Sequence, residues 1–431
     1  MPLLTMIERL SRARPGHVLA LAGLLMPPLA AAAALSLAPL LAVVALGTLT
    51  LGGYRELWRL EALAGLVIAL ALLGIVGTAS AAWSIIPLHS FLEGMRFLAI
   101  CAGGLVVIAV ALSLDTQERD RAFRWLVLGV VLALVILALA ALARFLWDPV
   151  PAGTPLARWL RGFTLFDRGA TTLALAVWPA ALGLSHRGKR LAAALLLIAA
   201  LAVILALRSR SAMLCLLVGL VVCTLAWWRP RLAAGTIGAG LLALAVVFPA
   251  APLGIDTVAR IHEAVPRLDN SMIHRLAIWH FAIDRIAERP ILGWGLDASR
   301  ALPGGADIIE DPRLPELNRP DAPWMPLHPH NAALQWRLEL GLPGTALASF
   351  VVLWLLWRIG WAAAVPPGAL ASSLALVAGA LVVAMVSYGF WQAWWQSSLW
   401  LMGALSIALA DDESSLASGR HRARRAATTS R

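Results

Sequence analysis

Charged side chains are scarce in this 431-residue chain: they make up 14% of the residues, whereas 60% are hydrophobic. Soluble domains contain about 25% charged residues, so this composition excludes an ordinary soluble domain. Apolar runs repeatedly reach the roughly 20 residues that a helix needs to cross a bilayer. The sequence therefore predicts an all-α, polytopic integral membrane protein.

Cysteine is rarer still, and the signatures of several protein classes are missing. The three cysteines, Cys101, Cys215 and Cys223, lie inside apolar runs without the spacing of metal ligands. We expect them to be small packed residues. The chain has neither a P-loop nor the G-x-S-x-G motif of a serine hydrolase. It also has no convincing internal repeat, a feature of many transporters.

The apolar runs predict about twelve transmembrane helices, because each crossing takes ~20 residues. The expected sections are residues 1–250 with spans 1 to 9, residues 251–330 as a large loop, residues 331–410 with spans 10 to 12, and residues 411–431 as a basic tail.

Short basic loops predict the orientation. Arginine and lysine cluster before the first span, after the second, fourth, sixth and eighth spans, and in the tail. By the positive-inside rule these segments are cytoplasmic, and so are both termini. The loop 251–330 then lies on the outer side. The formal net charge of +11 is explained by this bias and does not require a nucleic-acid partner.

The outer loop is long enough to contain helices of its own. It holds five of the nine histidines and slightly more acids than arginines. The stretch 269–290 is predicted to be helical, with an N-cap at Asp269, Asn270 or Ser271 and Pro290 as its stop.

Several arginines on the outer side run against the positive-inside bias. They are Arg158, Arg161, Arg168, Arg208, Arg210 and Arg275. An ionisable group near membrane depth usually faces a cavity or a partner, although a long side chain at a helix end also snorkels to the interface. Snorkelling is the alternative for Arg208, and the role of Arg168 stays open. As a set, the outer arginines favour an anion site, because guanidinium groups bind phosphate oxygens in pairs.

The stretch "HPHNAALQWRLELGLPG" (328–344) sets His328 and His330 at the mouth of an apolar helix. A neutral imidazole can act as a general base near pH 7. The spacing H-x-H also suits zinc, but no cysteine or third clustered histidine supports it, so no metal site is predicted. Asn331 is expected to cap the helix. Glu339 either hydrogen-bonds to a neighbour or pairs with Arg337.

Tryptophan is abundant, and several gather in "FWQAWWQSSLW" (390–400). Such a group is typical of an aromatic belt at the membrane interface. Stacking against a sugar or an isoprenoid is the alternative.

Three stretches resemble the O-antigen ligase family, which forms a superfamily with O-antigen polymerases and O-linked oligosaccharyltransferases. The family pattern is S-R at a span end, an Arg before a Trp and P-x-x-G-x-G, and H-N-x-x-L with E-x-G-x-x-G. It falls here on Ser209–Arg210, on Arg275, Trp279, Pro290, Gly293 and Gly295, and on His330, Asn331, Leu334, Glu339, Gly341 and Gly344. "LFDRGAT" at 165–171 departs from it, because many relatives have Asn where this chain has Asp167 or Arg168.

The resemblance implies a GT-C-like glycosyltransferase with a large helical periplasmic loop between spans 9 and 10. It implies transfer of O-antigen polysaccharide from undecaprenyl pyrophosphate to the lipid A-core oligosaccharide, at the periplasmic face of a Gram-negative inner membrane. The reaction is expected to be inverting and metal-independent, without a cofactor. His330 is the expected base, with His328 as the alternative. Arg210, Arg275 and Arg161 are expected to bind the pyrophosphate.

Two other functions stay open at this point. A polymerase of the same superfamily would join repeat units to each other, and the motifs hardly separate it from a ligase. A transporter or flippase of lipid-linked polysaccharide would place polar groups and broken helices near the midplane. The spans of this chain have apolar centres, and the polar groups gather on the outer side.

Overall fold

The computed structural model describes residues 14–147, 164–251, 253–265, 269–362 and 365–410. Within these ranges the chain is helical, with no β-strand and only an isolated bridge between Ile308 and Pro323. The all-α class is therefore confirmed. The main helices are α2 (Pro15–Ala33), α3 (Leu37–Thr50), α4 (Ala64–Ala79), α5 (Pro87–Ala111), α6 (Thr116–Trp147), α8 (Thr164–His186), α9 (Arg190–Ala206), α10 (Arg210–Trp228), α11 (Pro230–Leu242), α12 (Ile255–Ala264), α13 (Asn270–Glu288), α14 (Ala332–Gly360) and α15 (Pro367–Val386). A further helix covers 393–410.

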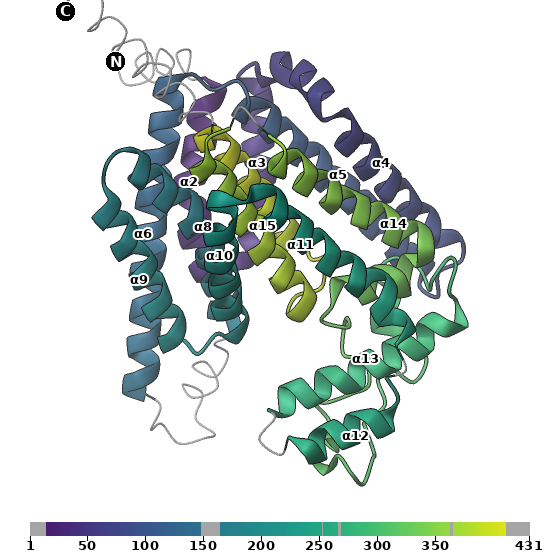
Figure 1. Cartoon of the computed structure of the whole chain (residues 1–431). Helices are drawn as coiled ribbons and strands as arrows, with labels where there is room; N and C mark the ends of the chain where they lie inside the picture. The colour runs from purple at the N-terminus through teal and green to yellow at the C-terminus, as the bar shows by residue number, and fades with distance from the viewer. Residues whose placement is uncertain (1–13, 148–163, 252, 266–268, 363–364, 411–431) are drawn as a thin grey trace, which may run out of the picture.

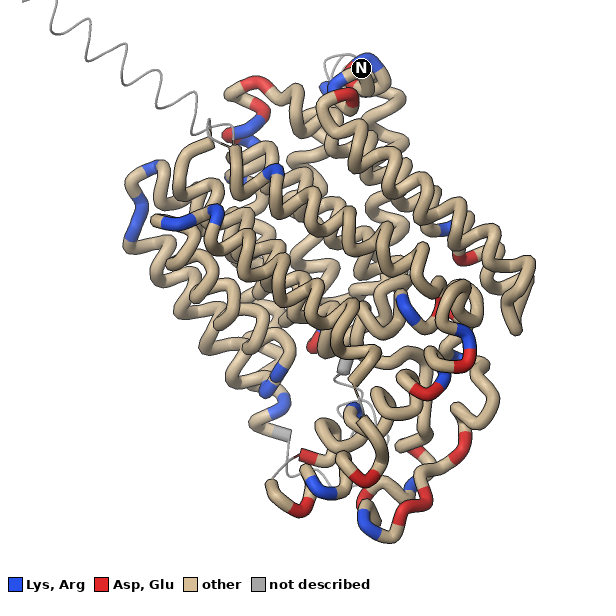
Figure 2. The backbone as a smooth tube through the Cα atoms, turned by 45° about the vertical axis from the view of Figure 1, so that its right-hand side comes forward, with Lys and Arg blue, Asp and Glu red and all other residues tan. Residues whose placement is uncertain are grey.

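Eight segments of the described chain are long and apolar enough to span a membrane. The first of them, Pro15–Thr50, contains both α2 and α3. These two helices form a hairpin, since Gly47 near the end of α3 faces Val18 near the start of α2. Figure 2 shows Lys, Arg, Asp and Glu mostly at the two ends of the bundle, with few along its middle. The protein is thus a polytopic helical membrane protein, while the total of about twelve crossings stays a prediction.

Small residues let the membrane helices approach closely. A Cβ on Gly129 of α6 would lie 2.6 Å from the carbonyl oxygen of Gly23 in α2, and one on Gly169 of α8 would lie 2.6 Å from the Cα of Ala31. Close backbone approach replaces the hydrophobic driving force that is missing between helices in lipid. The cysteines pack in the same way: Cys101 and Cys215 are buried, and Cys223 is half-buried.

Helices α12 and α13 lie beyond one end of the bundle (Figure 1). Asp269 is the N-cap of α13 and accepts a hydrogen bond of 3.1 Å from the backbone N–H of Ser271. The helix ends at Glu288, just before Pro290. The predicted helix is therefore confirmed. The two helices share a small apolar core with the loop that follows, which includes Val258, Ile273 and Leu314.

Helix α14 is broken at Gly341, whose φ of 60° and ψ of −148° are not helical. The loop before α14 binds to the break. The backbone N–H of Trp294 donates to Leu338 (3.0 Å), that of Gly295 to Glu339 (2.8 Å), and that of Leu342 to Ile291 (2.9 Å). A Cβ at Gly341 would lie 1.9 Å from the Ile291 carbonyl oxygen. These motif glycines therefore hold the loop against the membrane helix.

The prediction of an interfacial aromatic belt at 390–400 is wrong for three of its tryptophans. Trp391, Trp394 and Trp395 are buried. Trp391 packs edge-on against Phe97 of α5, with ring centroids 5.7 Å apart. Composition alone does not tell which side of a segment faces lipid, and here the rings face the bundle.

Candidate active site

The two predicted histidines lie in a tight turn immediately before α14. His330 has a φ of 52°, which is unusual for a residue other than glycine. Its ring Nδ1 contacts the backbone carbonyl of Ser387. Trp279 of α13 donates its ring N–H to the Pro329 carbonyl (2.9 Å), and Asn331 caps α14 by accepting from Leu334 N–H (3.1 Å). The turn is therefore held by three separate parts of the chain.

The hydrogen bonds of these histidines assign opposite tautomers to the two neutral rings. A carbonyl oxygen only accepts, so Nδ1 of His330 carries the proton and its Nε2 is left with a free lone pair. The backbone N–H of His330 donates to Nδ1 of His328 at 3.2 Å, so the proton of His328 lies on Nε2. The ring centroids are 4.4 Å apart. Of the two, only His330 presents an unprotonated Nε2.

Both imidazoles are held in the neutral form. Burial, together with the positive charge of Arg275, lowers the pKa of His330 to about 4. Burial also lowers the pKa of His328 to about 3, with contributions from His330 and Arg300. Desolvation disfavours the charged imidazolium, so both rings are neutral at pH 7, each with a single ring proton.

One of the predicted arginines, Arg275, acts on this turn, and Arg210 is linked to Arg275 through Asp269. Arg210, the first residue of α10, forms two contacts with the Asp269 carboxylate, at 2.6 and 3.2 Å. Arg275 lies on α13 and interacts electrostatically with Asp269 and Arg210, and its charge also acts on His330. The fold thus brings together Arg210, Arg275 and His330, which are widely separated in the sequence.

The other outer arginines have different surroundings or are not described. Arg161 and Arg158 lie outside the described residues. Arg168 stacks over the Trp394 ring at 5.3 Å. Arg208 is exposed and has a φ of 56° in the short connection between α9 and α10.

Glu339 is the centre of a hydrogen-bond network, and the alternative pairing with Arg337 is wrong. Its buried carboxylate accepts four hydrogen bonds. The donors are the Asp297 backbone N–H (2.8 Å), Trp391 Nε1 (2.5 Å), Ser299 Oγ (2.5 Å) and Gln335 Nε2 (3.2 Å). Four donors suffice for a buried carboxylate. Sequence spacing alone did not identify these partners, because three of them come from other segments.

This network also positions His330. Gln335 donates to Glu339, and its carbonyl oxygen accepts from the Phe390 backbone N–H at 2.8 Å. Ser387, whose carbonyl contacts His330, lies three residues before Phe390. Glu339 therefore stabilises both sides of the turn without contacting the imidazole.

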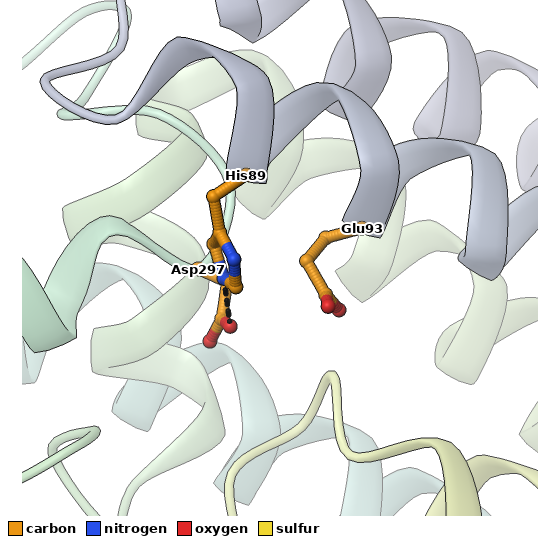
Figure 3. A group of neighbouring side chains, drawn as sticks. All are labelled: His89, Glu93 and Asp297. Atoms are coloured by element: carbon orange, nitrogen blue, oxygen red, sulfur yellow. Dashed lines mark hydrogen bonds and ion pairs between the residues drawn. The ribbon is translucent and has the colours of Figure 1, made fainter.

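A second polar group lies at the start of α5, where His89 and Glu93 meet Asp297 (Figure 3). Their ligand atoms all lie within 4.8 Å of one another, a donor set that suits a divalent metal. However, Asp297 already pairs with Arg300 (2.5 Å) and His89 (2.8 Å), and Glu93 pairs with Arg96. This group was not predicted from the sequence, although the spacing of residues 89 and 93 gave a signal, because residues i and i+4 share one helix face.

Comparison with known proteins shows a family similarity over the middle of the chain. Residues 193–349, from α9 into α14, match the family described as O-antigen ligase. This part of the chain is therefore similar to the O-antigen ligase family. Arg210, Arg275 and His330 all lie inside the matched segment.

Curated relatives of this chain come from Rickettsia and carry the name "Putative polysaccharide ligase". The chain is 29% identical to one from Rickettsia prowazekii (strain Madrid E) over 252 residues, which cover 58% of this chain and 60% of the relative. It is 28% identical to one from Rickettsia conorii (strain ATCC VR-613 / Malish 7) over 307 residues, or 70% of this chain and 71% of the relative. The match to the first relative thus spans three-fifths of its length.

Proposed function

We propose that this protein is a membrane-embedded O-antigen ligase. It would transfer O-antigen polysaccharide from undecaprenyl pyrophosphate to the lipid A-core oligosaccharide, at the periplasmic face of a bacterial inner membrane. In this proposal residues 251–330 form a periplasmic section between residues 1–250 and 331–410, and both termini are cytoplasmic. The observation that carries the proposal is the neutral His330, with its free Nε2, beside Arg275 and the Arg210–Asp269 pair.

The proposed reaction is a single displacement at the anomeric carbon of the donor. Nε2 of His330 takes the proton of the acceptor hydroxyl, whose oxygen attacks the face opposite the pyrophosphate. The bond from the anomeric carbon to the leaving oxygen breaks with inversion, and Arg210 and Arg275 stabilise the charge that develops on the pyrophosphate. His330 ends the step as imidazolium.

Arg275 links donor binding to base strength. In the empty site its positive charge contributes to the low pKa of His330. A pyrophosphate bound to the arginine would offset that charge and favour the imidazolium. His330 would thus be a better base when the donor is present.

Arginine side chains would take the role that a divalent cation fills in many phosphate-binding enzymes. The proposed reaction therefore needs no metal and no cofactor. Arg161 is the third candidate for the pyrophosphate, on the family resemblance. Because Arg210 is paired with Asp269, the pyrophosphate would compete with this carboxylate for the guanidinium group.

Transfer by the purified protein tests the proposal. Undecaprenyl pyrophosphate-linked O-antigen and rough lipopolysaccharide are incubated with EDTA and wild type, His330→Ala or His17→Ala. The control His17 lies at the start of α2, far from α14 in sequence. Transfer by wild type and His17→Ala, but not by His330→Ala, is expected.

Two other results would contradict parts of the proposal. Loss of wild-type transfer in EDTA would overturn the metal-independent mechanism. Growth of the lipid-linked glycan without transfer to lipopolysaccharide would make the protein a polymerase.

A further inference from the structure

The second polar group has an architecture of its own, and we name it the α5 cluster: His89, Glu93, Arg96, Asp297 and Arg300. His89, Glu93 and Arg96 follow one another at spacings of four and three residues on α5 and therefore share a helix face. Asp297 and Arg300 come from the loop that binds to the break in α14. Figure 3 shows His89 joined to Asp297, with Glu93 one turn along the helix.

The α5 cluster turns its acids inward and its bases outward. The Asp297 and Glu93 side chains are only 8% and 11% exposed. The corresponding values are 36% for His89, 42% for Arg96 and 39% for Arg300. A cation would reach the carboxylates only past two guanidinium groups, whereas an anion meets these groups first. The arrangement therefore favours an anionic ligand over a metal ion.

The outer bases are held in place before any ligand arrives. Oδ2 of Asp297 contacts Arg300 at 2.5 Å and His89 at 2.8 Å, and the backbone N–H of Asp297 donates to Glu339. Arg96 pairs with Glu93 and donates to the Trp391 carbonyl at 2.9 Å. A guanidinium group has five N–H donors, so each arginine keeps donors for a ligand. Preorganised donors lower the entropic cost of binding.

The α5 cluster is linked to the histidine turn and shares α5 with exposed apolar side chains. The charge of Arg300 acts on His328, which links the cluster to the turn. On α5, Leu88, Leu92 and Met95 are exposed, and in a membrane helix these side chains face lipid. A ligand that contacts both the arginines of the cluster and these apolar side chains would carry a negative charge and a lipid anchor. The charge of Arg275 acts on His330 instead, so Arg300 and Arg275 act on different histidines of the turn.

We propose that the α5 cluster binds a phosphate group of the lipid-anchored acceptor. This inference rests on the proposed function, in which the acceptor is lipid A-core, a phosphorylated glycolipid. Arg300 and Arg96 would each donate to phosphate oxygens, with His89 as a third donor. Asp297 and Glu93 would act as positioning residues that orient the two guanidinium groups.

Equilibrium binding of the acceptor tests the inference separately from transfer. The full chain is placed in nanodiscs of neutral lipid, and fluorescently labelled lipid A-core is titrated in its native form and after chemical removal of its phosphates. For Arg300→Gln we expect about tenfold weaker binding of the phosphorylated form, since hydrogen bonds between charged groups are the stronger ones. Binding of the dephosphorylated form should not change. Arg300→Lys, which keeps the charge, should recover part of the affinity.

Arg124→Gln is the matched control, because Arg124 also pairs with an aspartate, Asp120, on an exposed helix surface. It should bind both forms of the acceptor like wild type. Equal weakening of both forms by Arg300→Gln would overturn the inference and make the residue structural. Competition by phosphatidylglycerol vesicles as strong as that by the acceptor would assign the site to bulk lipid headgroups instead.

Two further measurements distinguish this inference from a cation site and from the proposed ligase activity. Binding of Mn²⁺ by wild type that is lost in His89→Gln would make the α5 cluster a cation site and overturn the proposal. If binding depends on phosphate and on Arg300 but wild type transfers no glycan, the inference stands and the proposed ligase activity fails.

Discussion

Replacement of Glu339 by alanine should destabilise the protein strongly, although the residue is proposed to touch no substrate. Its carboxylate is buried and accepts from four donors. The Ser299 hydroxyl can turn to another acceptor. The other three donors cannot turn away. The Asp297 donor is a backbone N–H, and the Trp391 donor belongs to a rigid indole ring. The Gln335 amide is held because its oxygen accepts a hydrogen bond from the Phe390 backbone N–H.

The magnitude follows from these three donors. Each buried donor left without a partner costs about 1–3 kcal/mol, so Glu339→Ala should lose roughly 3–9 kcal/mol. Domains are typically stable by about 5–15 kcal/mol, so this variant would lose a large part of its stability. In Glu339→Gln the amide oxygen can still accept hydrogen bonds from Asp297 and Trp391. Only the Gln335 amide then faces another N–H₂ group, and the expected cost is about 1–3 kcal/mol.

The assay uses the chain's own thiols. Cys101 and Cys215 are buried and unbonded, so a thiol-reactive fluorescent dye reports unfolding as detergent-solubilised protein is heated. Glu339→Gln should unfold at a temperature somewhat below that of wild type, and Glu339→Ala at a temperature far below both. The reasoning is refuted if Glu339→Ala unfolds at the wild-type temperature, because the three donors would then have found other partners.

Three further predictions concern the turn, the arginine pair and the helix break. The kcat/KM of transfer should stay constant down to about pH 5 and fall only near pH 4, because the base of pKa about 4, His330, is lost when it is protonated; a fall centred near pH 6.5, the ordinary histidine value, would contradict the buried neutral ring. Asp269→Asn should lower the donor KM severalfold in steady-state kinetics, since it releases Arg210 while asparagine still caps α13; an unchanged KM would mean that the ion pair does not compete with the donor. Gly341→Ala should give little monodisperse protein in size-exclusion chromatography, because its Cβ would lie 1.9 Å from the Ile291 carbonyl oxygen; a normal elution peak would show that the break can shift.

Local sequence signals were sufficient for the fold class and for single helices. Long apolar runs leave few alternatives to membrane helices, because backbone groups must be satisfied internally in lipid. The start and end of α13 were predicted because a capping aspartate and a proline act within one turn. Asn331 was predicted as the cap of α14 for the same reason.

Long-range contacts were not predicted in the same way. Glu339 has partners about forty residues upstream and fifty downstream, and its spacing from Arg337 was misleading. The tryptophans at 391, 394 and 395 have the composition of an interfacial belt but pack inward. The α5 cluster joins residues 89 and 297, and neither is conspicuous alone.

The sequence by itself determined that this chain is a helical membrane protein with arginines and histidines concentrated outside its apolar runs. Hydrophobicity and capping act over one helix, so they can be read along the chain. Only the tertiary structure decided which of the two histidines has a free Nε2, because that depends on a carbonyl 57 residues away, at Ser387. It also decided that Arg210 and Arg275 share Asp269, and that the motif glycines hold a loop to a broken helix. Such contacts depend on which surfaces pack together, and no local pattern carries that information.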